Sequence, residues 1–482
     1  MQKATLAVAF PNHAAAPDAN RATRPWQNRA MLAHAPQAPS LCARLASRAG
    51  AGRRAAALLA ALLLAIVSAA CQTPVRLMPT PVSFSTGEVD PFEKAGSSAK
   101  GTDVPVLYAT NRGALIEWPE PIYTILPSEQ VRVGIAHVRI GDDGLDWETL
   151  HRLSTSDEPG KRPIVQLDWL EPKGALRGDG GAASRTDMRA FFALVDQALA
   201  ASASRDLVVY IHGANNTVPR AAAQAAQLRH FMGRRVVVLT FMWPSAGSVL
   251  RYLTDVASAA ASVEPFARLV EALAANTKAS AIDIVAYSAG AQVASPGLFL
   301  LATTRPGESH AAIRERLRLR NVYYAAPDID TRRFLEELRD YVDIVERVTI
   351  AANLNDSALR VAEIIHGASR AGRPDTDELD AEQTTFLIEA SQRLGFDVIK
   401  VNPEDIPGLG PRSHAFWYEE PWVSSDLLGL LLLNAGPAQR GLVEQTGPRG
   451  ARYWTFPPDF YERVVRLFTQ APSGAPASVP SR

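Results

Sequence analysis

The chain has 482 residues, 47% of them hydrophobic, which is enough to bury one large core or two smaller ones. Its 50 basic and 50 acidic side chains give a formal net charge of zero, so the overall charge does not favour nucleic-acid binding. No phosphate-cradling glycine loop and no cluster of metal-ligand residues stands out, and we expect neither a cofactor nor a metal site. The two cysteines, Cys42 and Cys71, lie near the N-terminus, which excludes disulfides and thiol catalysis from the rest of the chain.

The first part of the chain is a basic leader. Residues 1–54 carry eight basic side chains and one acidic side chain, a balance of 8 − 1 = +7, and they are rich in alanine and proline. This composition offers no periodic apolar pattern from which a core could form. We predict that the leader is disordered.

A short apolar segment, residues 55–71, follows the leader. Two arginines lead into Ala55–Ala70, and the small residues Ser68, Ala69 and Ala70 come directly before Cys71. A basic region, an apolar stretch and small residues before a cleavage point are typical of an export signal. Small residues before a cysteine further predict lipoprotein processing, with Cys71 as the lipidated first residue. We therefore expect a membrane-anchored lipoprotein of the cell envelope that faces the periplasm.

Two departures from the usual signal pattern leave alternatives open. Serine stands at position 68, where leucine is usual, and the leader is long unless translation starts at Met31. One alternative is an uncleaved signal anchor, although the 16 residues of Ala55–Ala70 are fewer than the ~20 that span a bilayer. The other is simple secretion.

The remaining chain divides by composition into three parts. Residues 72–100 are rich in Pro, Ser, Thr and Gly, which predicts a tether. Residues 101–465 contain the apolar runs of one large domain, and residues 466–482 are expected to be a disordered tail.

Buried strands recur through the large domain. Continuous β-branched and aromatic runs alternate there with alanine-rich segments of helical length, in the order strand, helix, strand. A parallel sheet covered by helices on both faces requires this pattern. We therefore predict an α/β fold with a mostly parallel central sheet. The runs are residues 207–212, 236–241, 321–326, 347–352 and 396–401, together with the run that opens the segment Ile282–Gln292.

The segment Ile282–Gln292 reads I-D-I-V-A-Y-S-A-G-A-Q and differs by one letter from a G-x-S-x-G nucleophile elbow. Such an elbow holds its serine on a sharp turn between a buried strand and a helix, so the residues two positions away must be small. Ala286 and Gly290 meet this requirement on either side of Ser288. The segment predicts that Ser288 is a nucleophile.

A second motif, H-G-A-N-N, spans His212–Asn216 at the end of the strand run 207–212. In folds with a nucleophile elbow, the loop after the third strand supplies one oxyanion-hole donor, and the residue after the nucleophile supplies the other. Gly213 would let the loop come close to the substrate. We expect the backbone N–H groups of Ala214 and Ala289 to form the oxyanion hole.

Several motifs in order carry a family resemblance. They are V-L-Y-A-T-N-R (Val106–Arg112), Y-I-H-G-A-N-N (Tyr210–Asn216), W-P-S-A-G (Trp243–Gly247), Y-L-T-D (Tyr252–Asp255), A-Y-S-A-G, A-A-P-D-I-D (Ala325–Asp330) and N-D-S-A-L-R (Asn355–Arg360). Together they resemble a bacterial family of α/β hydrolases of uncharacterised function in the esterase/lipase superfamily. The resemblance implies a serine hydrolase and gives no substrate.

A serine nucleophile needs a base and an acid, which follow it in the chain order Ser, Asp or Glu, His. His414 is the predicted base, since it is the final histidine and lies in a loop after a late strand, whereas His366 lies within a predicted helix at 357–367. Asp356, after the strand run 347–352, is the predicted acid. Asp328 and Asp330, after the preceding strand, stay open as alternatives, and Asp330 could instead cap a helix.

Residues Leu427–Leu433 are almost wholly aliphatic. They could form an apolar wall that binds an acyl group, but an all-round apolar helix is usually buried, so a core helix is the favoured interpretation.

These patterns predict a serine hydrolase that cleaves a carboxylic ester or a related acyl bond through an acyl-enzyme on Ser288. The expected substrate is a small-molecule or lipid-like acyl compound. Acyl transfer by the same fold, and a catalytically silent module that binds a partner, are the alternatives.

Overall fold

The computed structural model describes residues 74–470, except for 95, 97–99, 159, 179–181, 394 and 448–449. These residues all fall within one compact unit of the chain. The predicted leader 1–54, the signal segment 55–71 with Cys71, and residues 471–482 of the predicted tail lie outside the described residues.

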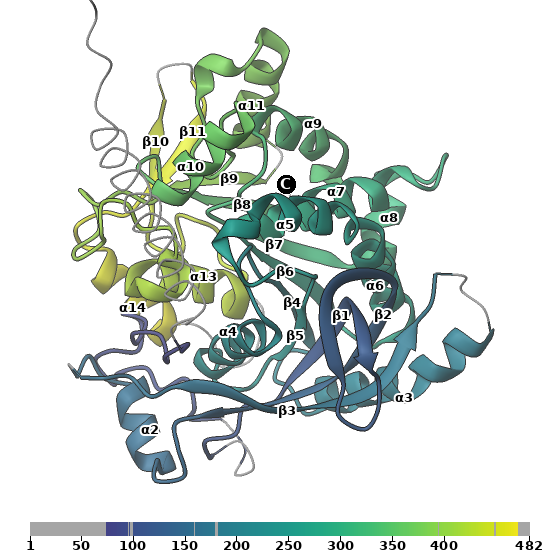
Figure 1. Ribbon diagram of the computed structural model, residues 1–482. Helices are drawn as coiled ribbons and strands as arrows, with labels where there is room; N and C mark the ends of the chain where they lie inside the picture. The colour runs from purple at the N-terminus through teal and green to yellow at the C-terminus, as the bar shows by residue number, and fades with distance from the viewer. Residues whose placement is uncertain are drawn as a thin grey trace, which may run out of the picture. The chain divides into compact units, whose positions relative to one another are not determined.

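A mixed sheet of eleven strands organises the described chain, with the order β10-β11-β9-β8-β7-β6-β4-β5-β1-β2-β3 (Figure 1). The strands are β1 (Val106–Ile116), β2 (Ile122–Ile140), β3 (Val165–Leu176), β4 (Asp206–Ile211), β5 (Val237–Phe241), β6 (Ala281–Tyr287), β7 (Leu319–Ala325), β8 (Arg347–Ala352), β9 (Phe396–Lys400), β10 (Val443–Thr446) and β11 (Arg452–Thr455). The strands from β1 through β5, β4, β6, β7, β8 and β9 to β11 pair in parallel. The predicted α/β class with a mostly parallel sheet is confirmed.

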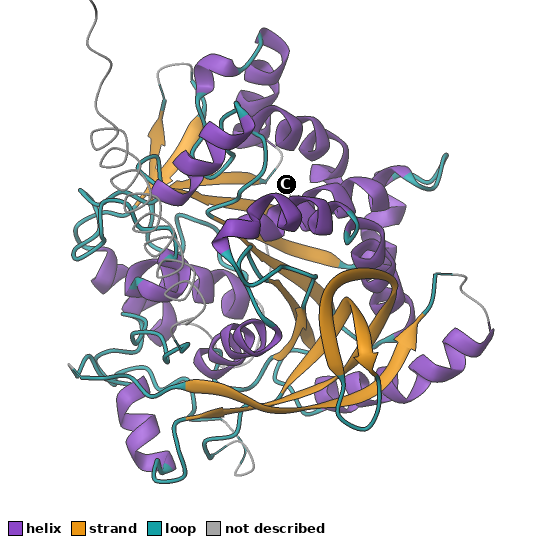
Figure 2. Cartoon of the chain, viewed as in Figure 1, coloured by secondary structure: helices purple, strands orange, loops and turns teal. Residues whose placement is uncertain are grey.

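Helices cover both faces of the sheet (Figure 2). The α-helices are α2 (Trp147–Ser154), α3 (Ala182–Ala200), α4 (Val218–Phe231), α5 (Tyr252–Ala260), α6 (Val263–Asn276), α7 (Ala291–Thr303), α8 (His310–Leu317), α9 (Thr331–Tyr341), α10 (Ser357–His366), α11 (Ala381–Arg393), α12 (Phe416–Glu419), α13 (Pro421–Leu433) and α14 (Phe460–Gln470). Short 3₁₀ turns are η2 (Val249–Arg251), η3 (Ser288–Gly290), η4 (Val342–Ile344) and η5 (Thr376–Glu378). Helices α3, α6, α7, α8, α9 and α11 contribute to the core on one face, and α4, α12, α13 and α14 to the core on the other.

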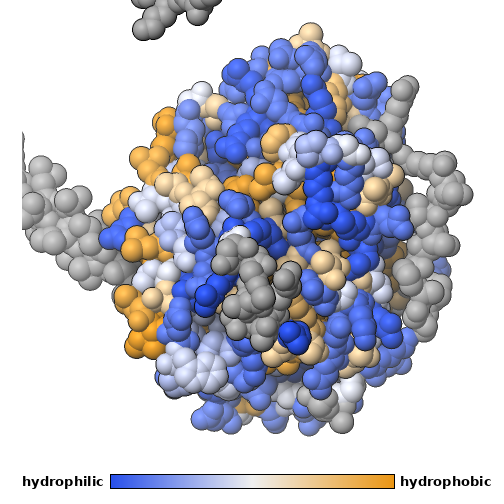
Figure 3. All heavy atoms as spheres, turned by 90° about the vertical axis from the view of Figure 1, so that its right-hand side faces the viewer, coloured by the Kyte–Doolittle hydropathy of each residue, from blue (hydrophilic) through white to orange (hydrophobic). Residues whose placement is uncertain are grey.

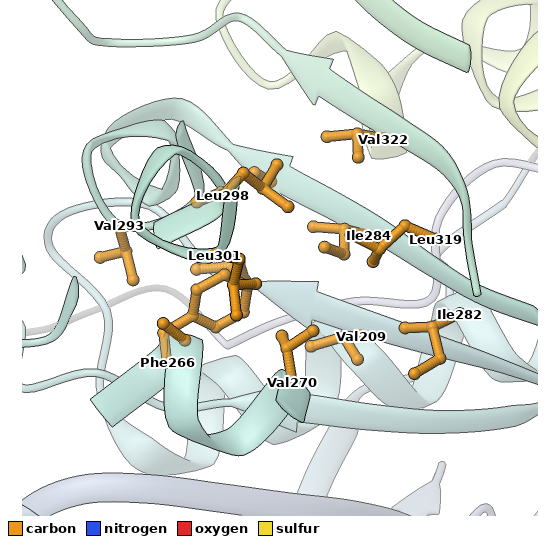
Figure 4. Close-up of a cluster of buried hydrophobic side chains, with 14 of the residues drawn as sticks. Val209, Phe266, Val270, Ile282, Ile284, Val293, Leu298, Leu301, Leu319 and Val322 are labelled. Carbon is orange, nitrogen blue, oxygen red and sulfur yellow. The ribbon is translucent and has the colours of Figure 1, made fainter. Parts of the chain in front are cut away.

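The central strands are apolar throughout because the sheet is buried on both faces. Every residue of β4, β5, β6 and β7 is buried. On one face, Phe266 of α6 and Leu298 of α7 pack against side chains such as Ile284 of β6 (Figure 4). The runs in the sequence are apolar at every position because helices cover both faces of these strands.

Antiparallel strands extend both edges of the sheet, so the predicted alternation of strand and helix holds only in its centre. The strands β1, β2 and β3 form a meander at one edge, and β10 and β11 form a hairpin at the other. Burial along β2 and β3 alternates or is partial. Edge strands of this kind lack the continuous apolar runs that marked the parallel strands.

Residues 74–94, which the sequence assigned to a tether, pack on the domain instead. Leu77, Met78, Phe84 and Phe92 are almost fully buried. Backbone hydrogen bonds also join this segment to Pro163 and Val165, next to the first residues of β3. The prediction of a tether over 72–100 was wrong for this part. Its composition is dominated by Pro and polar residues, but a few apolar side chains are enough to bind the segment to the domain.

The C-terminal boundary also differs from the prediction. Helix α14 continues to Gln470, past the expected domain end at residue 465, and its Val464 and Val465 are buried. Helix α13 has an almost wholly buried central part, as the core interpretation of Leu427–Leu433 predicts. None of the helices in the described part of the chain has the length and hydropathy of a membrane span.

The turn from β6 into α7 approaches the end of β4 very closely. A Cβ atom placed on Gly290 would lie 2.7 Å from the carbonyl oxygen of Ile211 and 2.8 Å from that of His212. Both contacts are to backbone of a central strand, which cannot move aside as a side chain could. Glycine is therefore required at position 290 by packing alone.

We predict that Gly290→Ala lowers the free energy of unfolding by about 1–3 kcal/mol or more, because the added methyl group overpacks the contact with β4. Gly101→Ala is the matched control, since nothing lies within 4 Å of a Cβ at that position. Chemical denaturation of both variants measures the difference. Equal stabilities would show that the β6–α7 turn is not held as closely as the structure has it.

Candidate active site

Ser288 stands at the carboxyl edge of the sheet, the edge at which the parallel strands end. It directly follows β6 and has a φ angle of 52°, in the left-handed region that residues with a side chain adopt at a cost of about 1–3 kcal/mol. This conformation lets the chain turn sharply from strand into helix. Its side chain is therefore presented at the sheet edge, although only 7% of the residue is exposed.

Three predicted residues are joined by hydrogen bonds. Nε2 of His414 lies 2.8 Å from Oγ of Ser288, and Nδ1 of His414 lies 2.6 Å from Oδ2 of Asp356. The carboxylate can only accept, so Nδ1 carries the proton and Nε2 is left to accept from the serine hydroxyl. The structure thus brings together side chains 126 and 58 positions apart in sequence.

Asp356 is held by the helix that it starts. It is the N-cap of α10, where its Oδ1 accepts hydrogen bonds from the N–H groups of Ala358 at 2.9 Å and Leu359 at 3.0 Å. The other oxygen, Oδ2, faces His414. Asp356 is fully buried, and both of its carboxylate oxygens have hydrogen-bond partners. One carboxylate therefore caps a helix and orients an imidazole.

The loop that carries His414 is tied to the loop after β8. Nδ2 of Asn353 donates to the carbonyl of Ser413 at 2.8 Å, and Oγ of Ser357 donates to the carbonyl of Arg412 at 3.2 Å. The ring of Tyr287 packs beside the imidazole, with 5.3 Å between ring centroids. The sequence alone gave no role to Asn353 or Ser357, although Ser357 lies in the motif Asn355–Arg360 and both residues stand close to Asp356.

The loops after β4 and β5 are fastened together by Asp255. Its carboxylate accepts from the N–H of Asn215 at 2.9 Å, from Oγ of Ser245 at 2.8 Å and from the N–H of Ala246 at 2.6 Å. Arg112 adds bonds from the same guanidinium nitrogen to the carbonyls of Asn216 and Ser245. The motifs that contain these residues are distant in sequence, and in the structure their hydrogen bonds hold the loops after β4 and β5 together.

His212, in the H-G-A-N-N motif, is a structural histidine. It is fully buried, its Nδ1 donates to the carbonyl of Gly213, and its ring stacks on Trp243 at 5.2 Å. Burial, with the nearby Arg112 charge, lowers the pKa of His212 to about 3. The imidazole is therefore neutral across the physiological range and lends stiffness to the loop.

The loop after β4 passes directly beside Ser288. A Cβ on Gly213 would lie 2.9 Å from Cβ of Ser288, so only glycine allows this approach. Ala214 follows, and within the described part of the chain its N–H has no hydrogen-bond acceptor. Ala289 follows Ser288 in the η3 turn. Both backbone positions named for the oxyanion hole therefore adjoin the serine.

The alternative acids and the other late histidine belong to a neighbouring cluster. Asp328 accepts from Nε of Arg370 at 2.7 Å and from the hydroxyl of Tyr252 at 2.6 Å, and Nε2 of His366 lies 3.3 Å from that hydroxyl. Asp330 caps α9 by accepting from the N–H of Arg333. Burial, followed by the Arg370 charge, lowers the pKa of His366. Asp356, rather than Asp328 or Asp330, contacts His414.

A separate apolar cavity of about 540 Å³ lies between α9, α11 and the strands β8 and β9. None of Ser288, His414 and Asp356 lines it. Among the residues that the structure describes, no three His, Cys, Asp or Glu side chains gather closely enough to hold a metal ion.

Residues 188–429 match the family described as alpha/beta hydrolase of unknown function (DUF900). That range includes Ser288, Asp356 and His414, as well as the two loops that Asp255 fastens together. No curated protein matches the chain. The mostly parallel sheet with helices on both faces agrees with the match, and the chain belongs to this alpha/beta hydrolase family.

Proposed function

We propose that the protein is a serine hydrolase that cleaves a carboxylic ester or a related acyl bond through an acyl-enzyme on Ser288. The observation that carries the proposal is the unbroken hydrogen-bond chain from Asp356 through His414 to Ser288. A serine hydroxyl is a weak nucleophile until an adjacent base takes its proton, and this arrangement supplies the base and its orienting acid.

In the proposed first half-reaction, Oγ of Ser288 attacks the acyl carbon while its proton passes to Nε2 of His414. The imidazolium that forms is stabilised by the carboxylate of Asp356. His414 then returns the proton to the leaving-group oxygen as the bond from the acyl carbon to that oxygen breaks. The acyl group is left as an ester on Ser288.

In the second half-reaction, water takes the place of the alcohol. His414 accepts a proton from the water, whose oxygen attacks the acyl carbon, and the same proton returns to Oγ when the acid product leaves. In both steps the carbonyl oxygen becomes negative. The N–H groups of Ala289 and Ala214 are the proposed donors that stabilise it.

A fluorophosphonate probe tests the proposal, because only an activated serine is labelled. The expected result is one label on Ser288, with hydrolysis of short p-nitrophenyl esters. An unlabelled, folded protein would favour a silent binding module. Product partitioning toward added alcohols would instead indicate acyl transfer.

We predict that Ser288→Ala and His414→Ala each lower turnover by roughly 10⁴–10⁶, and that the double variant loses little more, because the two groups act as a unit. Asp356→Asn should lower turnover by up to about 10⁴. It should stay folded, since asparagine also caps helices. Steady-state kinetics and thermal melts measure these effects.

Asp330→Asn is the matched control for Asp356→Asn, because both replace a helix-capping aspartate by another capping residue. It should change turnover little. If Asp330→Asn abolished turnover while Asp356→Asn preserved it, the acid would be the residue after β7.

The oxyanion-hole proposal predicts that Ala214→Pro lowers turnover by about 10²–10³, because proline removes the N–H donor. Ala214→Gly keeps that N–H and should retain most of the turnover. Both proteins should first be shown to melt as the wild type does. A folded Ala214→Pro variant with full turnover would exclude this donor.

We further propose that the protein is anchored to an envelope membrane through lipid on Cys71. The basic and apolar residues before Cys71, and the small residues at positions 68–70, support this proposal. A signal anchor and simple secretion are the competing possibilities.

We predict that Cys71→Ala blocks lipid attachment and leaves an unprocessed precursor in the inner membrane. Labelling cells with a fatty-acid analogue, together with the mobility of the protein on a gel, measures both effects. A Cys71→Ala protein that is processed and located like the wild type would overturn the lipoprotein assignment.

A further inference from the structure

Large hydrophobic side chains are exposed in an uneven pattern. Of the twelve that stand out among the described residues, eleven belong to three segments. We call these eleven the apolar rim: Leu115, Ile116, Trp118, Ile122 and Leu126 around the β1–β2 turn; Leu250 and Leu253 in η2 and α5; and Leu354, Val361, Ile364 and Ile365 before and in α10. The twelfth is Trp169 of β3, which stacks on His137.

All three rim segments lie at the carboxyl edge of the sheet, on both sides of Ser288. The first segment spans the end of β1 and the start of β2, and the other two follow β5 and β8. Gly213, Ser288 and Asp328 follow the strands between β5 and β8, namely β4, β6 and β7. The face drawn in Figure 3 is mostly hydrophilic, and its largest hydrophobic patches lie on the left. The left of Figure 3 corresponds to the front of Figure 1, where α5 and the β1–β2 turn are drawn. The rim therefore flanks the candidate active site.

Contacts between α5 and α10 make two parts of the rim neighbours. The hydroxyl of Tyr252, at the start of α5, meets Nε2 of His366, at the end of α10. Their rings lie 5.6 Å apart. Leu253 and Ile365, the adjacent residues in sequence, are both exposed beside this contact.

Helix α10 has apolar side chains on two faces. Leu359 and Ala362 are buried against the domain, while Val361, Ile364 and Ile365 are exposed. A helix at the surface of a soluble protein normally presents a polar outer face. Contiguous exposed apolar surface of this kind is typical of a site that another apolar surface covers.

We propose that the apolar rim docks on a lipid surface, so that the substrate is an acyl ester held in a membrane, vesicle or micelle. This inference rests on the proposed function. A protein partner seated across the rim would close off Ser288, whereas an amphiphile surface covers the rim and supplies the ester at once. The substrate class is therefore a lipid ester presented at an interface.

Two arginines of the rim fit the same occupant, whereas the exposed Glu117 and Glu120 flank Trp118 and Glu117 pairs with Arg132. Arg251 lies between Leu250 and Leu253, Arg360 precedes Val361, and both arginines are exposed. Trp118 is 70% exposed at the tip of the β1–β2 turn. Surface-bound elements of membrane proteins combine Trp and Leu with Arg or Lys, which meet the anionic headgroups.

The described chain begins at the opposite edge of the sheet. Arg76 pairs with Ile164, next to the first residue of β3, where β3 starts at the amino edge. If Cys71 carries lipid, the four steps from Cys71 to Val75 span at most about 14 Å. The anchor would then join the domain at the edge of the sheet opposite the rim.

Quenching of Trp118 tests the docking directly and does not depend on turnover. The full-length protein is mixed with anionic vesicles that contain brominated acyl chains, and the signal of Trp118→Phe is subtracted to isolate Trp118. Insertion of the rim should quench Trp118 and shift its emission to shorter wavelength. An unchanged Trp118 signal would overturn the proposal, as would rim-dependent self-association found by light scattering without any effect of vesicles.

Kinetics give a second test. For each variant, the rate on a vesicle-embedded long-chain ester is divided by the rate on a soluble short-chain ester. Leu253→Glu with Ile364→Glu should lower this ratio by roughly tenfold or more, because the added charges oppose insertion. Trp169→Glu, the exposed apolar residue outside the rim, is the control and should preserve the ratio. An unchanged ratio in the rim variant would overturn the proposal.

The two tests separate this inference from the proposed function. A wild-type protein that hydrolyses neither ester would contradict the proposed function, while quenching of Trp118 would still report docking. Hydrolysis of the soluble ester with no quenching would leave the hydrolase in place and remove the lipid surface.

Discussion

The structure around Ser288 depends on the close packing of the β6–α7 turn against the end of β4 and the loop that follows it. Gly290 lies against the carbonyls at the end of β4, and Gly213 lies against Ser288 itself. Both contacts exclude even a methyl group, so the serine turn and the H-G loop are fixed relative to each other by steric packing. The buried parallel strands behind them supply the rigidity, since their residues contact core on both faces. The positive φ of Ser288 persists because this packing overdetermines it.

Around this contact, helix starts and buried polar groups hold the side chains in place. Asp356 bonds the first turn of α10 with one carboxylate oxygen and His414 with the other. Asp255 binds the loops after β4 and β5 through three hydrogen bonds. Buried carboxylates satisfied in this way specify loop geometry, because any displacement leaves a charge unpaired in an apolar setting. The exposed residues of the apolar rim lie on both sides of this polar site, and this contrast is the basis of the inferred contact with lipid.

The centre of the sheet could be predicted from the sequence, and its edges could not. The runs at 207–212, 236–241 and 347–352 have no polar face to obscure them, and each lies within one residue of the strand that forms. The edge strands β2 and β3 have alternating or partial burial, so they lack the continuous apolar runs that identify a strand in the sequence. Residues 74–94 resemble a tether by composition, and only the domain surface that receives Leu77 and Phe84 distinguishes them from one.

By itself, the sequence determined the types and the chain order of the chemical groups: a serine between small residues, an aspartate after a strand and a late histidine. Local chemistry is sufficient for this, since a sharp strand-to-helix turn restricts its neighbours. Only the tertiary structure decided that Asp356 contacts His414 while Asp328 contacts Arg370. The two carboxylates follow neighbouring strands, and the later parts of the chain that pack against them decide which partner each one binds. It also decided that the exposed apolar residues flank Ser288, since residues far apart in sequence share an edge only after the sheet has formed.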